Sequence, residues 1–226
     1  MKALLIPLKD PANAKSRLAG LLSADDRRRL AWAMFEDVSR AVCATTMPDR
    51  IVLVSSFEPA IEHARSAGWE VLVEQAQESE SASIDWASRW LAERGVEAVL
   101  RLPADIPLVQ ERDIDELISV ELQTPAAVLV PSREGTGTNA ILRAPPNLFP
   151  SRFGPNSLTL HKQEALRLGV KCLIVTNPRI ALDIDEPGDV KAMLEIGGST
   201  HTLSVLTEMR IAGVTALGAW PSLPPV

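Results

Sequence analysis

The chain has 226 residues, of which 46% are hydrophobic, 23% are charged and 4% are aromatic. These fractions are typical of a soluble globular protein and exclude a disordered, collagenous or coiled-coil chain. The net charge is −6, and no apolar run comes near the roughly 20 residues of a membrane span, so we expect neither nucleic-acid binding nor membrane insertion.

The first half of the chain alternates short apolar runs with segments of helical period, a pattern typical of βα units on a parallel sheet. A helix is predicted to begin after Ser23, because this residue and the aspartates that follow it form a helix-start signal. Gly68 and Gly95 end two further predicted helices. The predicted strands are residues 2–8, 51–55, 70–73 and 97–102, and the two later helices are residues 58–67 and 81–94.

The second half departs from this rhythm. Two predicted strands, residues 125–131 and 139–143, are joined by a tight glycine-bearing loop, which suggests an antiparallel pair. We therefore predict an α/β fold, a three-layer sandwich with a mostly parallel central sheet. The remaining predicted elements are a helix over 155–168, a strand over 170–176, an extended stretch over 180–185 and a helix over 187–194.

The length favours one large domain, which we place at residues 1–198, followed by a tail over residues 199–226. Leu203, Leu206 and Met209 indicate a helix in the tail, and prolines end it. The tail is predicted to pack on the body or on a partner subunit, which makes a homodimer a candidate assembly.

Charged residues follow two of the predicted strands, and in parallel sheets ligands bind at the carboxyl ends of strands. Lys9, Lys15 and Arg17 follow the first strand, and Asp105 follows the fourth. Cations suit phosphate oxygens, and Mg²⁺ is usually held by one or two carboxylates plus substrate phosphates. Together they indicate a nucleoside triphosphate site. Alternatively, the cations are only solvated and Asp105 belongs to a turn.

Asp183 and Asp185 form a second acidic group, in the sequence LDID. An extended backbone places both carboxylates on one face, because side chains alternate with a period of two. Like charges so close repel each other unless a cation compensates them, so a metal site and a solvated turn both remain open.

Two glycine-bearing segments are candidate anion sites. The first, GTGTN at residues 135–139, lacks the third glycine of a dinucleotide fingerprint and the lysine of a P-loop, so a dehydrogenase and a P-loop ATPase are disfavoured. Thr138 and backbone N–H groups could hold an anion, or the segment is a plain hairpin turn. The second, FGPNS at residues 153–157, precedes a helix and is either an anion site or a simple cap by Asn156 or Ser157.

Other functional signatures are absent from the sequence. There is no GxSxG and no HExxH segment, and the three histidines show no metal spacing, so we expect them to be surface or helix residues. Cys43 and Cys172 are too few for a disulfide or zinc framework, which predicts a reducing cytoplasmic location and two buried thiols.

The ordered set of motifs resembles one family. It comprises IPLKDPANAKSRL, the LSxxxR helix start, LPADIPL, GTGTN, RFGPNS with His161 beyond it, and LDIDEPGDV. In this order they are similar to the 2-phospho-L-lactate guanylyltransferase family, which also includes members that use phosphoenolpyruvate or 3-phosphoglycerate. The resemblance covers about residues 1–195. It implies a Rossmann-like, GT-A-like nucleotidyltransferase sheet that binds GTP, Mg²⁺ and a phosphorylated three-carbon acid in deazaflavin coenzyme biosynthesis.

The resemblance also implies roles for individual residues. Asp105 and Asp183 match the metal-binding aspartates, with Asp185 as a helper. Lys15 and Arg17 match the loop around the nucleotide, to which we add Lys9, and with Asp105 they are the predicted catalytic residues. The residues that match positions holding the phosphorylated acid are Thr138, Gly154 and Ser157.

One segment departs from the family. Where members usually show Gly-Leu-Asn entering the helix, this chain has Glu78-Ser79-Glu80-Ser81-Ala82-Ser83. The segment is predicted to lie near the nucleotide base, so Glu78 or Glu80 could accept hydrogen bonds from guanine. Other readings stay open: a nucleotidyltransferase for a sugar phosphate or the molybdenum cofactor, whose glycine-rich loop is missing here, or a catalytically silent nucleotide-binding module.

Overall fold

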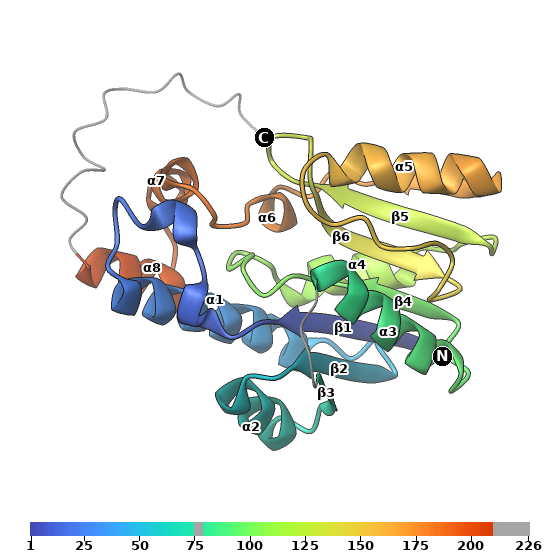
Figure 1. Ribbon diagram of the computed structural model, residues 1–226, viewed down its shortest axis with the longest axis horizontal. Helices are drawn as coiled ribbons and strands as arrows, with labels where there is room; N and C mark the ends of the chain where they lie inside the picture. Colours follow the sequence, from blue (N-terminus) through green and yellow to red (C-terminus); the bar gives the residue numbers. More distant parts are fainter. Residues whose placement is uncertain (75–78, 210–226) are drawn as a thin grey trace.

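A computed structural model of the protein describes residues 1–74 and 79–209. Its centre is a seven-stranded sheet with the strand order β3-β2-β1-β4-β6-β5-β7, and Figure 1 shows its labelled strands, β3 to β5, stacked in this order. The strands are β1 (Lys2–Leu8), β2 (Arg50–Ser55), β3 (Glu70–Val73), β4 (Ala98–Arg101), β5 (Ala126–Pro131), β6 (Thr138–Ala144) and β7 (Lys171–Ile174).

The sheet is parallel except around one strand. β1 pairs in parallel with β2 and β4, whereas β6 is antiparallel to both β4 and β5, which confirms the predicted mixed sheet. The chain leaves β1 on one side for β2 and β3 and returns on the other side with β4. The strand order therefore reverses between β1 and β4, and the carboxyl ends of these strands form the crevice in which such folds bind ligands.

Helices cover both faces of the sheet, so the predicted three-layer α/β architecture is confirmed. Alternate residues of β1 point to opposite faces, Leu4 and Ile6 to one and Ala3 and Leu5 to the other. The first face packs against α1 (Ala24–Ala44), α2 (Glu58–Ser66) and α4 (Glu111–Ser119). The second packs against α3 (Glu80–Ala92), and further along the sheet β5 and β6 pack against α5 (Ser157–Leu168).

A smaller apolar cluster lies beside the crevice. It joins the start of α1 to the short helices η1 (Pro11–Asn13) and η2 (Ser16–Leu18), to α7 (Pro187–Ile196) and to α8 (His201–Glu208). These elements lie together in Figure 1, at the blue and red ends of the chain. Asp37 accepts hydrogen bonds from the first N–H groups of α8, at 2.9 and 2.8 Å, which fixes this helix on α1. Residues 210–226 of the predicted tail lie outside the described residues.

Several predictions of local structure were wrong. α4 was not predicted, although Ile114, Leu117 and Ile118 form a helical stripe that is buried against the sheet. The stretch predicted as extended over residues 180–185 begins inside a short helix, α6 (Pro178–Ala181), because Asn177 caps it. Neither thiol is fully buried: Cys43 is exposed and Cys172 half-buried. No helix in the described part of the chain is long and apolar enough to cross a membrane.

Candidate active site

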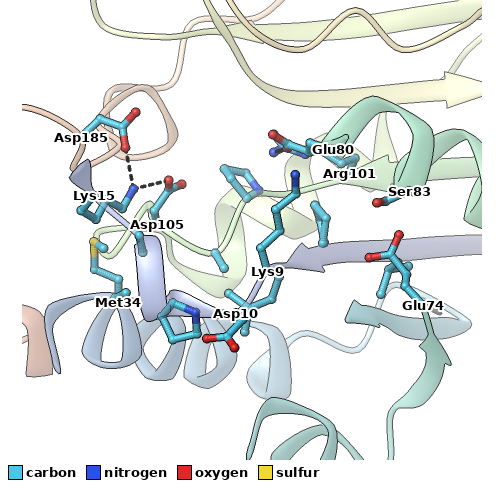
Figure 2. Close-up of a pocket in the computed structure, with 18 residues that line it drawn as sticks. Lys9, Asp10, Lys15, Met34, Glu74, Glu80, Ser83, Arg101, Asp105 and Asp185 are labelled. Atoms are coloured by element: carbon cyan, nitrogen blue, oxygen red, sulfur yellow. Dashed lines mark hydrogen bonds and ion pairs between the residues drawn. The ribbon is translucent and has the colours of Figure 1, made fainter. Parts of the chain in front are cut away.

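Two adjoining cavities open at the carboxyl ends of β1 and β4. The first, which we call the lysine cavity, has a volume of about 350 Å³ and is lined by Lys9, Lys15, Glu80, Arg101 and Asp105 among others (Figure 2). It lies at the strand-order reversal, where the sequence predicted a ligand site. Its lysines come from the loop after β1, and Asp105 comes from the loop after β4.

Lys15 is the central cation of the lysine cavity. Its side chain is only 8% exposed, and its Nζ donates to Asp105 Oδ2 at 2.6 Å and to Asp185 Oδ1 at 2.7 Å (Figure 2). Burial disfavours the ammonium, but the attraction of the two carboxylates outweighs it, so the pKa of Lys15 is raised above its usual value. Lys15 has a φ of +54°, a left-handed backbone conformation that is uncommon for a residue other than glycine, at the start of the short helix η2.

The loop that carries Lys15 is held at several points. Asp10 Oδ1 accepts the N–H of Ala12 at 2.8 Å and so caps η1. Arg27, in the first turns of α1, donates to the carbonyl of Ala14 at 3.3 Å and to that of Leu22 at 2.9 Å. The long loop is therefore a fixed part of the cavity wall rather than a solvated connection.

Two aspartates approach each other across the crevice. The N–H of Ile184 donates to the carbonyl of Asp105 at 3.1 Å, which ties the two loops together. Burial, and then the negative charge of Asp105, raise the pKa of Asp183 to about 6. For Asp105 itself burial opposes ionisation, but Lys15 lowers its pKa below the usual value. The carboxylate that repels Asp183 most strongly is thus Asp105, ahead of Asp185.

These carboxylates do not form a preassembled metal cage. Among residues 1–74 and 79–209 no group of three or more histidine, cysteine, aspartate or glutamate side chains converges as a metal site. Asp105 and Asp185 both pair with Lys15, at 2.6 and 2.7 Å, and the charges of both raise the pKa of Asp183. A pair of facing carboxylates is nevertheless the usual protein contribution to a Mg²⁺ site, in which substrate phosphates supply further oxygens. The donor set of Asp105 and Asp183 fits this ion.

The second cavity, which we call the hydroxyl cavity, has a volume of about 390 Å³. Three hydroxyl-bearing residues, Ser132, Thr138 and Ser157, line it together with Gly154, which has a φ of +120°. Ser132 packs closely on Gly137: a Cβ at this position would lie 2.9 Å from the Ser132 hydroxyl oxygen and would displace that side chain. The three residues predicted to hold the acid therefore lie in one cavity.

The two cavities share part of their walls. Glu80, Arg101, Asp105 and Asp185 line both, so a ligand in one could touch a ligand in the other. Asp183 lines only the hydroxyl cavity. Two reactants placed in the two cavities would therefore meet beside the aspartates.

The predicted nucleotide cations differ in their surroundings. Lys9 extends into the lysine cavity in Figure 2 and forms no ion pair within the described part of the chain. Arg17 lies at the mouth of the hydroxyl cavity with a 64% exposed side chain, and it pairs with Glu186 at 3.1 Å and Asp185 at 3.9 Å. Lys15 is therefore the buried cation of the three, whereas Lys9 and Arg17 are exposed and Arg17 is already paired with carboxylates.

Arg101 is a site residue that the sequence did not reveal. Its guanidinium is buried, donates to the carbonyl of Asn139 at 2.9 Å, and stacks over the Phe153 ring at 4.3 Å. It also forms an ion pair with Glu80, the residue predicted to contact guanine. Glu80 thus faces the junction of the two cavities, and the other carboxylate of that prediction, Glu78, lies outside the described residues.

Asn139 and His161 were missed as well. Asn139 Nδ2 donates to Asp183 Oδ1 at 2.9 Å and so orients this carboxylate. His161, expected to be a surface or helix residue, lies in α5 but is fully buried behind Thr138. Ser157 accepts the N–H of Thr138 at 2.8 Å and Asn156 makes no side-chain cap, so the segment before α5 is not a simple helix cap.

Comparison with known proteins identifies the family. The sequence model of the family described as "Guanylyl transferase CofC like" matches residues 1–216. The chain belongs to this family. It is therefore an enzyme of the nucleotidyltransferase class, and the resemblance inferred from the ordered motifs is confirmed.

Relatives in the family carry three substrate names. A phosphoenolpyruvate guanylyltransferase of Rubrobacter xylanophilus is 37% identical over 86% of this chain and 94% of its own. A 3-phospho-D-glycerate guanylyltransferase of Colwellia psychrerythraea is 30% identical over 84% of this chain and 90% of its own. A 2-phospho-L-lactate guanylyltransferase of Methanothermobacter thermautotrophicus is 29% identical over 91% of this chain and 90% of its own.

A solved structure shows the same fold. It is a putative nucleotide-diphospho-sugar transferase from Desulfovibrio desulfuricans G20, with a TM-score of 0.77, 14% identity, and coverage of 95% of this chain and 97% of that one. At this identity the likeness concerns the fold alone. It agrees with the predicted nucleotidyltransferase sheet, and within this CofC-like chain that sheet brings the two cavities together.

Proposed function

We propose that this chain transfers GMP from GTP to a phosphorylated three-carbon acid, in a Mg²⁺-dependent reaction that releases pyrophosphate. The observation that carries the proposal is the pair of adjoining cavities, one lined by lysines and one by hydroxyl-bearing residues. Asp105 lines both cavities, and Asp183 lines the second and lies close enough for the charge of Asp105 to raise its pKa. Family membership and the names of the relatives supply the guanine and the acid. Phosphoenolpyruvate is the first acid to test, because the 37% identical relative is named for it.

The lysine cavity would take the triphosphate. Lys9 and Lys15 suit phosphate oxygens, and Lys15 is held by carboxylates with which a triphosphate would compete. Arg17, at the mouth of the adjoining hydroxyl cavity, adds a further cation where the two reactants would meet. The hydroxyl cavity would take the acid, because Thr138, Ser157 and Gly154 offer hydrogen-bond donors to its oxygens.

The reaction follows from this placement. A phosphate oxygen of the acid attacks the α-phosphorus of GTP, a new P–O bond forms, and the bond to the bridging oxygen of the β-phosphate breaks with its electrons on pyrophosphate. The attacking oxygen carries no proton at neutral pH, so the site needs no general base. Positioning and charge neutralisation would supply most of the acceleration.

Mg²⁺ fits the site through Asp105 and Asp183, and when bound it would neutralise the phosphate oxygens that approach each other. The protein's own part is to hold these carboxylates: Lys15 fixes Asp105, and Asn139 fixes Asp183. Asp185 would act through Lys15.

The test is an assay of pyrophosphate release. GTP, ATP, CTP and UTP are each combined with phosphoenolpyruvate, 2-phospholactate, 3-phosphoglycerate and a sugar phosphate, with and without Mg²⁺, and the product mass is measured. Release with GTP and a three-carbon acid supports the proposal. Release only with a sugar phosphate would assign a different acceptor. Folded protein that binds nucleotide without any release would be a silent binding module.

A further inference from the structure

The hydroxyl cavity has an unusual distribution of hydrogen-bond donors. The Ser132 oxygen accepts the N–H of Gly137 at 2.9 Å, and the Ser157 oxygen accepts the N–H of Thr138 at 2.8 Å. Each hydroxyl therefore already accepts a hydrogen bond from the backbone, and its own proton is left to be donated. Both residues line the cavity.

The Thr138 hydroxyl also accepts a hydrogen bond, in this case from the buried side chain of His161. The N–H of Arg152 donates to His161 Nε2 at 2.8 Å, so this nitrogen carries the lone pair. A neutral imidazole has one protonated nitrogen, and the proton is therefore on Nδ1. Nδ1 lies 3.0 Å from Thr138 Oγ1, and the N–H must donate to that oxygen.

His161 stays neutral in this environment. It is fully buried, and burial together with the nearby charges of Arg143 and Arg101 lowers its pKa to about 4. The arrangement of protons is thus fixed near neutral pH. Phe149 and Phe153 pack against the imidazole ring, with centroids 6.2 and 5.0 Å away, which holds its orientation.

From this geometry we propose that His161 is a positioning residue of the acid site: by donating to Thr138 it makes the threonine hydroxyl a donor to an oxyanion of the bound acid. The inference rests on the proposed function and deepens it. Ser132, Thr138 and Ser157 then present their protons together, which suits a phosphate or carboxylate oxygen, a group that only accepts hydrogen bonds. His161 does not line the cavity. Its Nδ1 reaches the cavity through Thr138, while its Nε2 holds the backbone of Arg152, next to the lining residue Phe153.

The test is a double-mutant cycle with phosphoenolpyruvate as the probe. Thr138→Val removes the hydroxyl and keeps the shape, and His161→Leu removes the donor behind it. Each is expected to raise KM for the acid by roughly tenfold or more, with a smaller change in KM for GTP, because a hydrogen bond to a charged oxygen is lost. The double variant is expected to be no worse than Thr138→Val, since the two residues act as one.

A conservative variant separates positioning from folding. His161→Asn keeps an N–H donor near the Nδ1 position and is expected to recover much of the lost affinity for the acid. A KM for the acid that is unchanged in His161→Leu, or losses that add fully in the double variant, would overturn the proposal. If His161→Leu does not fold, a folded His161→Asn with a loss as large as that of Thr138→Val would overturn it equally. Failure of the proposed function is distinct, because wild-type protein would then release no pyrophosphate from GTP with any three-carbon acid.

Discussion

The two cavities solve the problem of binding anions in different ways. The lysine cavity uses charges that neutralise each other before any ligand arrives, with Lys15 shared between Asp105 and Asp185. The hydroxyl cavity uses neutral donors that are already oriented by backbone N–H groups and by His161. Charged groups adapt to a large, highly charged ligand, whereas fixed neutral donors discriminate by position. The first arrangement suits a nucleoside triphosphate, and the second suits a small acid.

We expect the greatest loss of activity from a change at the proposed Mg²⁺ site. Asp183→Asn keeps the shape and the contact to Asn139 but removes a carboxylate that we place on Mg²⁺. Turnover is expected to fall by roughly 1000-fold, because an ion that bridges phosphates loses a ligand. Stability is expected to hold or rise, since a charge that the fold disfavours is removed.

The matched control is Asp25→Asn, an exposed aspartate at the start of α1. It is expected to keep wild-type turnover in the same pyrophosphate assay. Turnover of Asp183→Asn within a few-fold of wild type would remove Asp183 from the metal site.

The neutral state of His161 predicts how stability changes with pH. The pKa of His161 is about 4 in the folded protein and 6.5 ordinarily, so the unfolded chain takes up the proton first. The stability that the neutral imidazole gives the folded protein is complete above pH 6.5 and is lost as the pH falls toward 4. The free energy of unfolding should fall by up to about 3 kcal/mol over this range. Urea unfolding at several pH values checks this, with His161→Asn as the reference. An identical pH dependence in both proteins would show that His161 does not titrate as described.

Lys15→Met tests whether the lysine cavity depends on balanced charge. The change leaves Asp105 and Asp185 without their shared cation, and the free energy of unfolding is expected to fall by about 2 kcal/mol. Adding Asp105→Asn should return part of this stability, because the unpaired carboxylate is then gone. Activity should stay low in both variants. If Lys15→Met alone is as stable as wild type, Lys15 does not stabilise the fold by pairing with Asp105 and Asp185.

The smallest expected effect concerns the pair that spans both cavities. Glu80→Gln weakens the contact to Arg101 and should cost about 1 kcal/mol or less in the free energy of unfolding, because Glu80 is partly exposed. If Glu80 also accepts hydrogen bonds from guanine, as the sequence predicts, the preference for GTP over ATP should fall too. Glu93→Gln, at the exposed far end of α3, is the control. Unchanged nucleotide preference would leave Glu80 as a partner of Arg101 only.

The sequence predicted those features that are local. β1 was predicted with its observed bounds because a continuous apolar run marks a buried parallel strand, and α1 because Ser23 caps it. α4 was missed although its signal was present: Gln110 and Asp113 cap each other before a buried apolar stripe.

The site was predicted where family motifs mark it and missed where contacts are distant in the chain. Arg101 becomes a site residue only because Glu80, 21 positions earlier, and Asn139, 38 positions later, fold against it. His161 has an ordinary place in a helix, and only the packing of α5 behind Thr138 gives it a role. No periodicity or spacing reports such contacts. The departure at residues 78–83 was visible in the sequence, but the partner of Glu80 was not.

The most direct test of the division between the cavities compares Lys9→Ala with Thr138→Val. KM for GTP and KM for phosphoenolpyruvate are measured for each variant at saturating levels of the other substrate. We expect Lys9→Ala to raise KM mainly for GTP and Thr138→Val to raise KM mainly for the acid. The reverse pattern, or equal changes in both constants for both variants, would contradict the assignment of nucleotide and acid to separate cavities.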